Sequence, residues 1–173
     1  MESFKERNDL TIDVDDNTLN SNIISLIGVI RPLNCPSTNT KYGKVLSHSG
    51  IIAQTSDKYV LIEYMNDNKI KITEVDHYEP DKEEFIFQNF HFRQDPNERK
   101  PLEKKVKIFE FAETMANFMK DEEFDTFYHN CHKACRLTLK YYGISPPKAI
   151  ICEHNILFQG IIDYYTIYND NKT

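Results

Sequence analysis

The chain has 173 residues, of which 40% are hydrophobic, and its 21 basic and 27 acidic side chains give a formal net charge of -6. A chain of this size can bury one hydrophobic core but is short for two, so we expect a single domain. No run of lysine and arginine interleaves with aromatic residues, which argues against nucleic acid as a partner.

The charged N-terminal segment, residues 1–21, predicts a flexible polar leader, followed by one domain over residues 22–168 and a frayed tail at 169–173. The leader lacks the apolar centre of a signal peptide, and no stretch approaches the roughly 20 apolar residues of a membrane span. We therefore expect no transmembrane segment and a cytoplasmic protein, in the host cytoplasm or virion if it is viral. Four cysteines do not form the dense framework of a secreted scaffold, so we expect reduced thiols.

The front half of the chain predicts β-strands. Apolar runs, or apolar residues alternating with polar ones, are separated there by short turn-forming segments, a pattern typical of strands. The predicted strands span residues 22–33, 44–54, 58–65, 68–78 and 83–95. Their short connections favour an antiparallel sheet of about five strands, an ordinary sheet size.

The back half predicts two main helices. From residue 101 to 123 the apolar period changes to that of a helix. Its apolar positions include Val106, Phe109, Met115 and Phe118. A second helix is predicted from Cys131 to Tyr142, because Gly143 is a good residue to end a helix and two prolines follow. The expected fold is α+β, with the antiparallel sheet packed against these two helices.

The start of the second helix draws attention as a site of chemistry. Asn130 is a favoured N-cap, which places Cys131 in the first turn, where free backbone N–H groups and the helix dipole favour a thiolate. His48 opens an apolar strand, and Glu63 interrupts the apolar run of the next. If these strands pair around the turn between them, Glu63 comes opposite His48. Cys131, His48 and Glu63 would then supply a nucleophile, a base and an orienting group.

The order of these segments resembles a known family. An early "HSGI" strand, then "LIEYM", then a late helix that begins "NC" and ends "YYGI", is similar to the permuted branch of the NlpC superfamily of papain-like cysteine proteins. That branch includes lecithin:retinol acyltransferase-like enzymes and proteins of poxviruses and other large viruses. The resemblance covers residues 22–145. Acyltransferase-like members have histidine at the position of Glu63, and "NCHKA" shares only its first two residues with their "NCEHF" motif.

The resemblance implies a circularly permuted papain-like fold with Cys131 as nucleophile, His48 as base and Glu63 as the third polar residue. It implies a thiol-dependent hydrolase (peptidase or amidase) or acyltransferase that acts on an amide, ester or thioester, without a cofactor. Peptides, proteins and acyl lipids all remain open as substrates, and these residues do not separate hydrolysis from acyl transfer.

Two other interpretations fit the same segment. The potential zinc ligands are His129, Cys131, His132, Cys135, Cys152 and His154. Ligands on one helical turn rarely complete a tetrahedron, and no C-x-x-C knuckle is present, so the favoured interpretation has no metal. A papain-like fold can also serve as a catalytically silent interaction module. Cys135 lies one turn after Cys131 and is expected in the core or as a secondary redox site.

Overall fold

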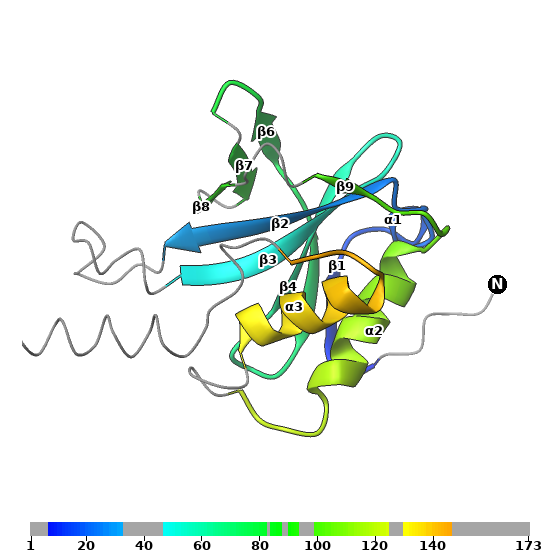
Figure 1. The fold of residues 1–173 in the computed structure, drawn as a ribbon, viewed down its shortest axis with the longest axis vertical. Helices are drawn as coiled ribbons and strands as arrows, with labels where there is room; N and C mark the ends of the chain where they lie inside the picture. Colours follow the sequence, from blue (N-terminus) through cyan, green and yellow to red (C-terminus); the bar gives the residue numbers. More distant parts are fainter. Residues whose placement is uncertain are drawn as a thin grey trace, which may run out of the picture.

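The structure, a computed structural model, describes residues 7–32, 47–82, 84–87, 90–93, 99–124 and 130–146. Within these ranges the chain forms an α+β fold, in which one mixed sheet carries its two longer helices on the same face (Figure 1). None of the helices in these ranges has the length and apolar character needed to cross a membrane.

The sheet is larger than the sequence predicts, and it is not purely antiparallel. Its strands within the described residues are β1 (Leu10–Asp13), β2 (Ser25–Pro32), β3 (Ser47–Gln54), β4 (Tyr59–Tyr64), β5 (Ile70–Glu74), β6 (His77–Glu79), β7 (Glu84–Phe87), β8 (Phe90–Arg93) and β9 (Lys100–Pro101). They join in the order β1-β5-β4-β3-β2-β8-β7-β6, with β9 beside β2. Strands β2 to β5 are antiparallel neighbours, as their short connections predict, but β1 pairs parallel with β5. The prediction of an antiparallel sheet of about five strands is corrected accordingly.

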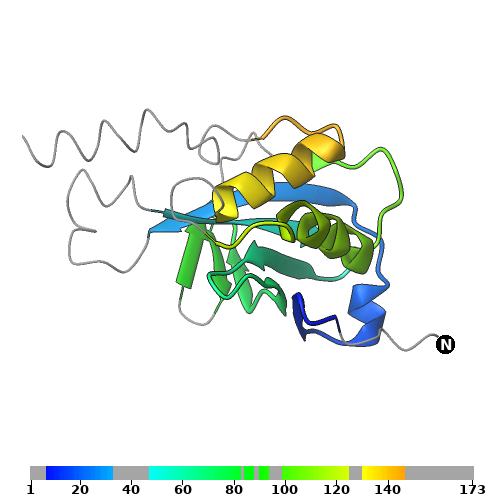
Figure 2. The same cartoon turned by 90° about the horizontal axis from the view of Figure 1, so that it is seen from below.

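Three helices are described: α1 (Asp16–Leu19), α2 (Ile108–Met119) and α3 (Cys131–Tyr141). The two main helices expected from the sequence are α2 and α3, which lie side by side against one face of the sheet (Figures 1 and 2). The predicted end of α3 is confirmed, because Tyr142 is the C-cap and Gly143 adopts a φ of 76°, a conformation that glycine takes without steric cost.

The two faces of the sheet build two apolar clusters. Along β3, Ile51 points toward the helices and packs with Phe111 of α2, while the next residue, Ile52, points to the opposite face. On that opposite face Ile52 and Leu61 pack against Phe85 of β7, because the β6–β8 segment lies on the side of the sheet away from α2 and α3 (Figure 2). Burial of each such side chain contributes about 1.5–3 kcal/mol. The alternation along β3 places Ser49, Ile51 and Ala53 on the face that carries the helices.

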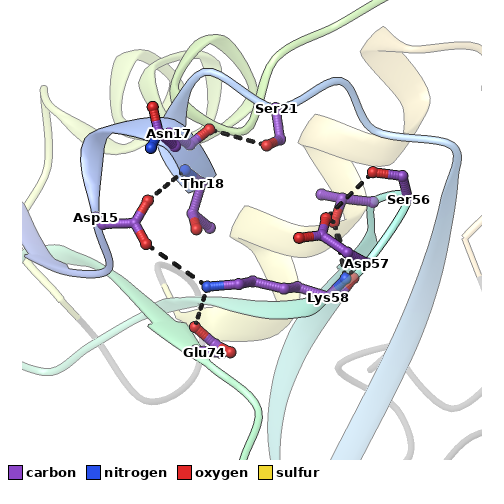
Figure 3. A network of polar contacts seen from close by, with 9 residues as sticks. Asp15, Asn17, Thr18, Ser21, Ser56, Asp57, Lys58 and Glu74 are labelled. Atoms are coloured by element: carbon purple, nitrogen blue, oxygen red, sulfur yellow. Dashed lines mark hydrogen bonds and ion pairs between the residues drawn. The ribbon is translucent and has the colours of Figure 1, made fainter.

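The predicted flexible leader over residues 1–21 is wrong for its second half, which contains β1 and α1. Asp15 caps α1 by accepting a hydrogen bond from the backbone N–H of Thr18 at 2.7 Å. The same carboxylate lies 3.6 Å from Nζ of Lys58, which also pairs with Glu74 of β5 at 2.9 Å (Figure 3). Polar contacts with residues far along the chain therefore hold this segment against the sheet.

Candidate active site

Cys131 occupies the first turn of α3. The side chain of Asn130 accepts a hydrogen bond from the backbone N–H of Lys133 at 3.1 Å, which confirms the predicted N-cap. The first turn carries no acidic residue, so no carboxylate competes there with a thiolate for the positive end of the helix. Cys131 is 5% exposed. Its place at the N-terminus of the helix favours the ionised form of the thiol.

His48 and Glu63 are in contact on neighbouring strands. Nε2 of His48 lies 2.9 Å from Oε1 of Glu63, and both side chains are buried. The pairing of β3 with β4 ends at Ile51 and Ile62, so continuing the register places Glu63 opposite Gly50 and not opposite His48 as predicted. The contact is therefore a diagonal one between residues on the same face of two strands.

Gly50 makes room for this diagonal contact. A Cβ atom at Gly50 would lie 2.9 Å from Cδ1 of Leu61 and 3.2 Å from Cγ of Glu63. The first distance is shorter than real Cβ contacts, the second is tighter than most of them, and Cγ of Glu63 is part of the side chain that holds His48. A side chain at position 50 would therefore displace the end of Leu61 and shift Glu63 by a few tenths of an ångström.

The thiol meets the His48–Glu63 pair at the start of β3. The pairing of β3 with β4 ends at Ile51, so Ser49 lies beyond the last paired residues. The backbone N–H of Ser49 donates to Sγ of Cys131 at 3.5 Å, which places the sulfur beside the peptide that joins His48 to Ser49. The structure thus brings together all three residues that the sequence suggested.

The electrostatics of the three groups favour a thiolate beside an imidazolium. Burial lowers the pKa of His48, but hydrogen bonding and charge from Cys131 and Glu63 outweigh it and raise the pKa to about 9. Burial raises the pKa of Cys131, yet the hydrogen bond and charge of His48, with the Ser49 donors, bring it below its ordinary value. The two shifts support each other, because the His48 imidazolium stabilises the Cys131 thiolate and the thiolate stabilises the imidazolium.

Cys135 differs from Cys131 although it lies only one turn further along α3. It is fully buried in the core that α3 forms with the sheet, and the Ser49 hydroxyl donates to its sulfur at 3.7 Å. Burial raises the pKa of the Cys135 thiol far above its usual value. Cys135 is therefore a neutral core residue. Ser49 contacts both thiols, Cys131 through its backbone N–H and Cys135 through its hydroxyl.

A zinc site finds no support among the residues that the structure describes. In those ranges no group of three or more histidine, cysteine, aspartate or glutamate side chains is arranged to hold a metal ion. Three of the suggested ligands, His129, Cys152 and His154, lie outside the described residues.

The segments at 34–44 and 151–165, which we expect to form walls of a substrate cleft, lie outside the described residues. A pocket of about 670 Å³ is present between Leu102 and the end of α3 at Tyr141. It contains none of the three candidate residues and is therefore not the space in which they would act.

Two further charged residues belong to the surroundings of the site. Arg31 of β2 is the direct Cα partner of His48, and Lys71 of β5 is the direct partner of Glu63. Sequence reasoning missed Arg31, although the signal was the one that identified Glu63: a charged residue within an apolar strand.

Comparisons of this chain with protein-family models, with curated proteins and with solved structures found no match. The case for any function therefore depends on the geometry of Cys131, His48 and Glu63.

Proposed function

We propose that the protein is a thiol-dependent hydrolase or acyltransferase that acts on an amide, ester or thioester bond. The observation that carries the proposal is the 2.9 Å contact between Nε2 of His48 and Oε1 of Glu63, beside a cysteine at the N-terminus of a helix. A nucleophile, a base and a group that orients the base are the parts that covalent acyl chemistry needs.

In the proposed mechanism each residue has one task. Because Nε2 of His48 faces Glu63, Nδ1 is the ring nitrogen left to take the proton of the Cys131 thiol. The thiolate attacks the acyl carbon, and the backbone N–H of Cys131 at the helix N-terminus donates to the developing oxyanion. His48 then protonates the leaving group, which departs from the acyl-enzyme. Water, an amine or a hydroxyl accepts the acyl group and regenerates the thiol.

The proposed architecture is a permuted papain-like domain of the NlpC type. The chain order supports it, since β3 with His48 comes first, β4 with Glu63 follows, and α3 with Cys131 comes last. The mechanism also requires Cys131 as a free thiol, which favours a reducing compartment such as the cytoplasm, of the producing cell or of a host.

One observation favours a second candidate, a catalytically silent interaction module. Cys131, His48 and Glu63 are only 5%, 8% and 3% exposed, so a substrate reaches the sulfur only if covering residues move aside. An interaction module needs no such opening, because it binds through its surface.

Trapping of an acyl-enzyme distinguishes these candidates. The protein is incubated with p-nitrophenyl acetate, and acetylation is located by intact-mass and peptide mass spectrometry. The proposal predicts rapid acetylation of Cys131 that is absent in Cys131→Ala and strongly slowed in His48→Gln. His77→Gln is the matched control, because His77 is an exposed histidine of β6 outside the site. Acetylation at the same rate in His48→Gln, or none at Cys131, contradicts an acyl-transfer site.

A further inference from the structure

Arg31 lies beside the candidate site on β2, a strand that carries none of the three candidate residues. It is the direct Cα partner of His48 in the β2–β3 pair. Directly opposed residues of antiparallel strands project to the same face with Cβ atoms about 4.5–5.5 Å apart. The Arg31 side chain is half-buried, and its face is the one on which Val29 packs in the second apolar cluster.

A row of charged side chains crosses the sheet at this level. Lys71 of β5 is the partner of Glu63, Glu63 contacts His48, and Arg31 is the partner of His48. The Lys71 ammonium lies 5.1 Å from the centre of the Phe87 ring, a contact that attracts a cation. The row therefore places a cation on each side of the His48–Glu63 pair.

The charge count at the site shows what Arg31 contributes. When the thiolate and the imidazolium have formed, Cys131 and Glu63 carry two negative charges and His48 carries one positive charge. Arginine stays protonated at any working pH, so Arg31 supplies the second positive charge and makes this partly buried cluster neutral. Unbalanced charge in such a place is costly.

Building on the function proposed above, we propose that Arg31 is a positioning residue of the site, whose fixed positive charge balances the Glu63 carboxylate and the Cys131 thiolate. Burial lowers the pKa of the Arg31 guanidinium overall, while the charges of Glu63 and Cys131 act in the opposite direction, which shows that Arg31 lies within electrostatic reach of both groups. Without Arg31 the cluster carries one excess negative charge, and the thiolate is the anion that takes up a proton most readily, because thiols have the higher pKa.

The other groups that face the site do not replace this charge. On α3, His132 is buried next to Cys131 in the sequence, and Cys135 is a buried neutral thiol. On β5, Lys71 is placed opposite Glu63 of β4, two strands away from β3, which carries His48. Arg31 is the fixed cation on the β2 side of His48.

The test is the apparent pKa of Cys131, read from the pH dependence of its alkylation by iodoacetamide and mapped by peptide mass spectrometry. We expect Arg31→Gln to raise this pKa by about one unit, which slows alkylation about tenfold at pH values below it, and Arg31→Lys to restore most of the difference. Lys58→Gln is the matched control, because it removes a cation that pairs with Asp15 and Glu74 away from the site.

The outcomes separate the role of Arg31 from the proposed function. If Cys131 is activated in the wild type but its pKa is unchanged in Arg31→Gln, or rises equally in Arg31→Lys, the role of Arg31 is refuted and the proposed function stands. If Cys131 is not activated in the wild type, the proposed function fails first. Should Arg31→Gln not fold, Arg31→Lys still decides, since a shift of about one unit with the charge retained contradicts the proposal.

Discussion

Replacing Glu63 by glutamine tests the pairing of His48 with a buried carboxylate. The substitution keeps the size of the side chain but removes the negative charge 2.9 Å from Nε2 of His48. Burial lowers the pKa of His48, whereas Cys131 and Glu63 raise it, and the balance places it at about 9 instead of 6.5. A rise of this size corresponds to about 3 kcal/mol in favour of the imidazolium.

In Glu63→Gln only Cys131 still favours the imidazolium, while burial continues to oppose it. Since Glu63 acts both through its hydrogen bond and through its charge, we expect the pKa of His48 to fall by about 1.5 units. A glutamine amide can also donate to Nε2, which stabilises neutral imidazole. At about pH 8 His48 is then mostly protonated in the wild type and mostly neutral in the variant.

Nuclear magnetic resonance measures this directly through the Cε1–Hε1 signals of the histidines between about pH 5 and 10, a range that spans free and raised histidine pKa values. The His48 signal is assigned by its loss in His48→Gln. Glu74→Gln is the matched control, because it removes one carboxylate that pairs with Lys58 away from the site. A wild-type His48 that titrates near 6.5, or a His48 pKa that is equal in Glu63→Gln and the wild type, refutes the reasoning.

Two structural predictions concern the residues that hold the site in place. Gly50→Ala introduces a Cβ atom 2.9 Å from Cδ1 of Leu61 and 3.2 Å from Cγ of Glu63, so we expect a loss of about 1–3 kcal/mol in urea denaturation and a lower His48 pKa. Unchanged values of both would show that the strands adapt without cost. Asn130→Ala removes the acceptor for the N–H of Lys133 and should lower the free energy of unfolding by about 1 kcal/mol. A smaller loss than in Asn130→Gly would contradict the capping role.

The parts of the fold that the sequence predicted are those with strong local signals. Asn130 and Gly143 delimit α3, because a cap and a glycine with positive φ act within a few residues of the chain. The turn between β3 and β4 was also recognisable, and the N–H of Thr55 donates to the carbonyl of Lys58 within it. His48, Glu63 and Cys131 stood out because each is a polar or reactive residue in an apolar setting.

Features that depend on distant partners were not predictable in this way. The leader is polar, yet Arg7 pairs with Glu113 of α2 and Asp15 pairs with Lys58, contacts that the local composition does not encode. In α2, apolar residues occur on several sides, and the helix buries Phe111 and Met115 while Phe118 remains 38% exposed. Only the position of the sheet decides which side becomes the inner one.

The register between β3 and β4 is another feature that the sequence did not predict correctly. The sequence placed Glu63 opposite His48, but the β3–β4 pairing ends at Ile51 and Ile62, and extending its register places Glu63 opposite Gly50. A shift of two residues keeps both side chains on the same face, so the apolar pattern is identical for the two registers. The correct register requires the packing of Leu61 and Glu63 around the missing side chain of Gly50.

The most direct test of the Cys131–His48 pair is the pH dependence of iodoacetamide alkylation in the wild type and in His48→Ala, with His77→Ala as control. We predict that Cys131 alkylates selectively with an apparent pKa below the roughly 8.5 of a free thiol, and that His48→Ala alone removes this advantage. A Cys131 that is inert, or no more reactive than Cys35 and unaffected by His48→Ala, contradicts a catalytic pair.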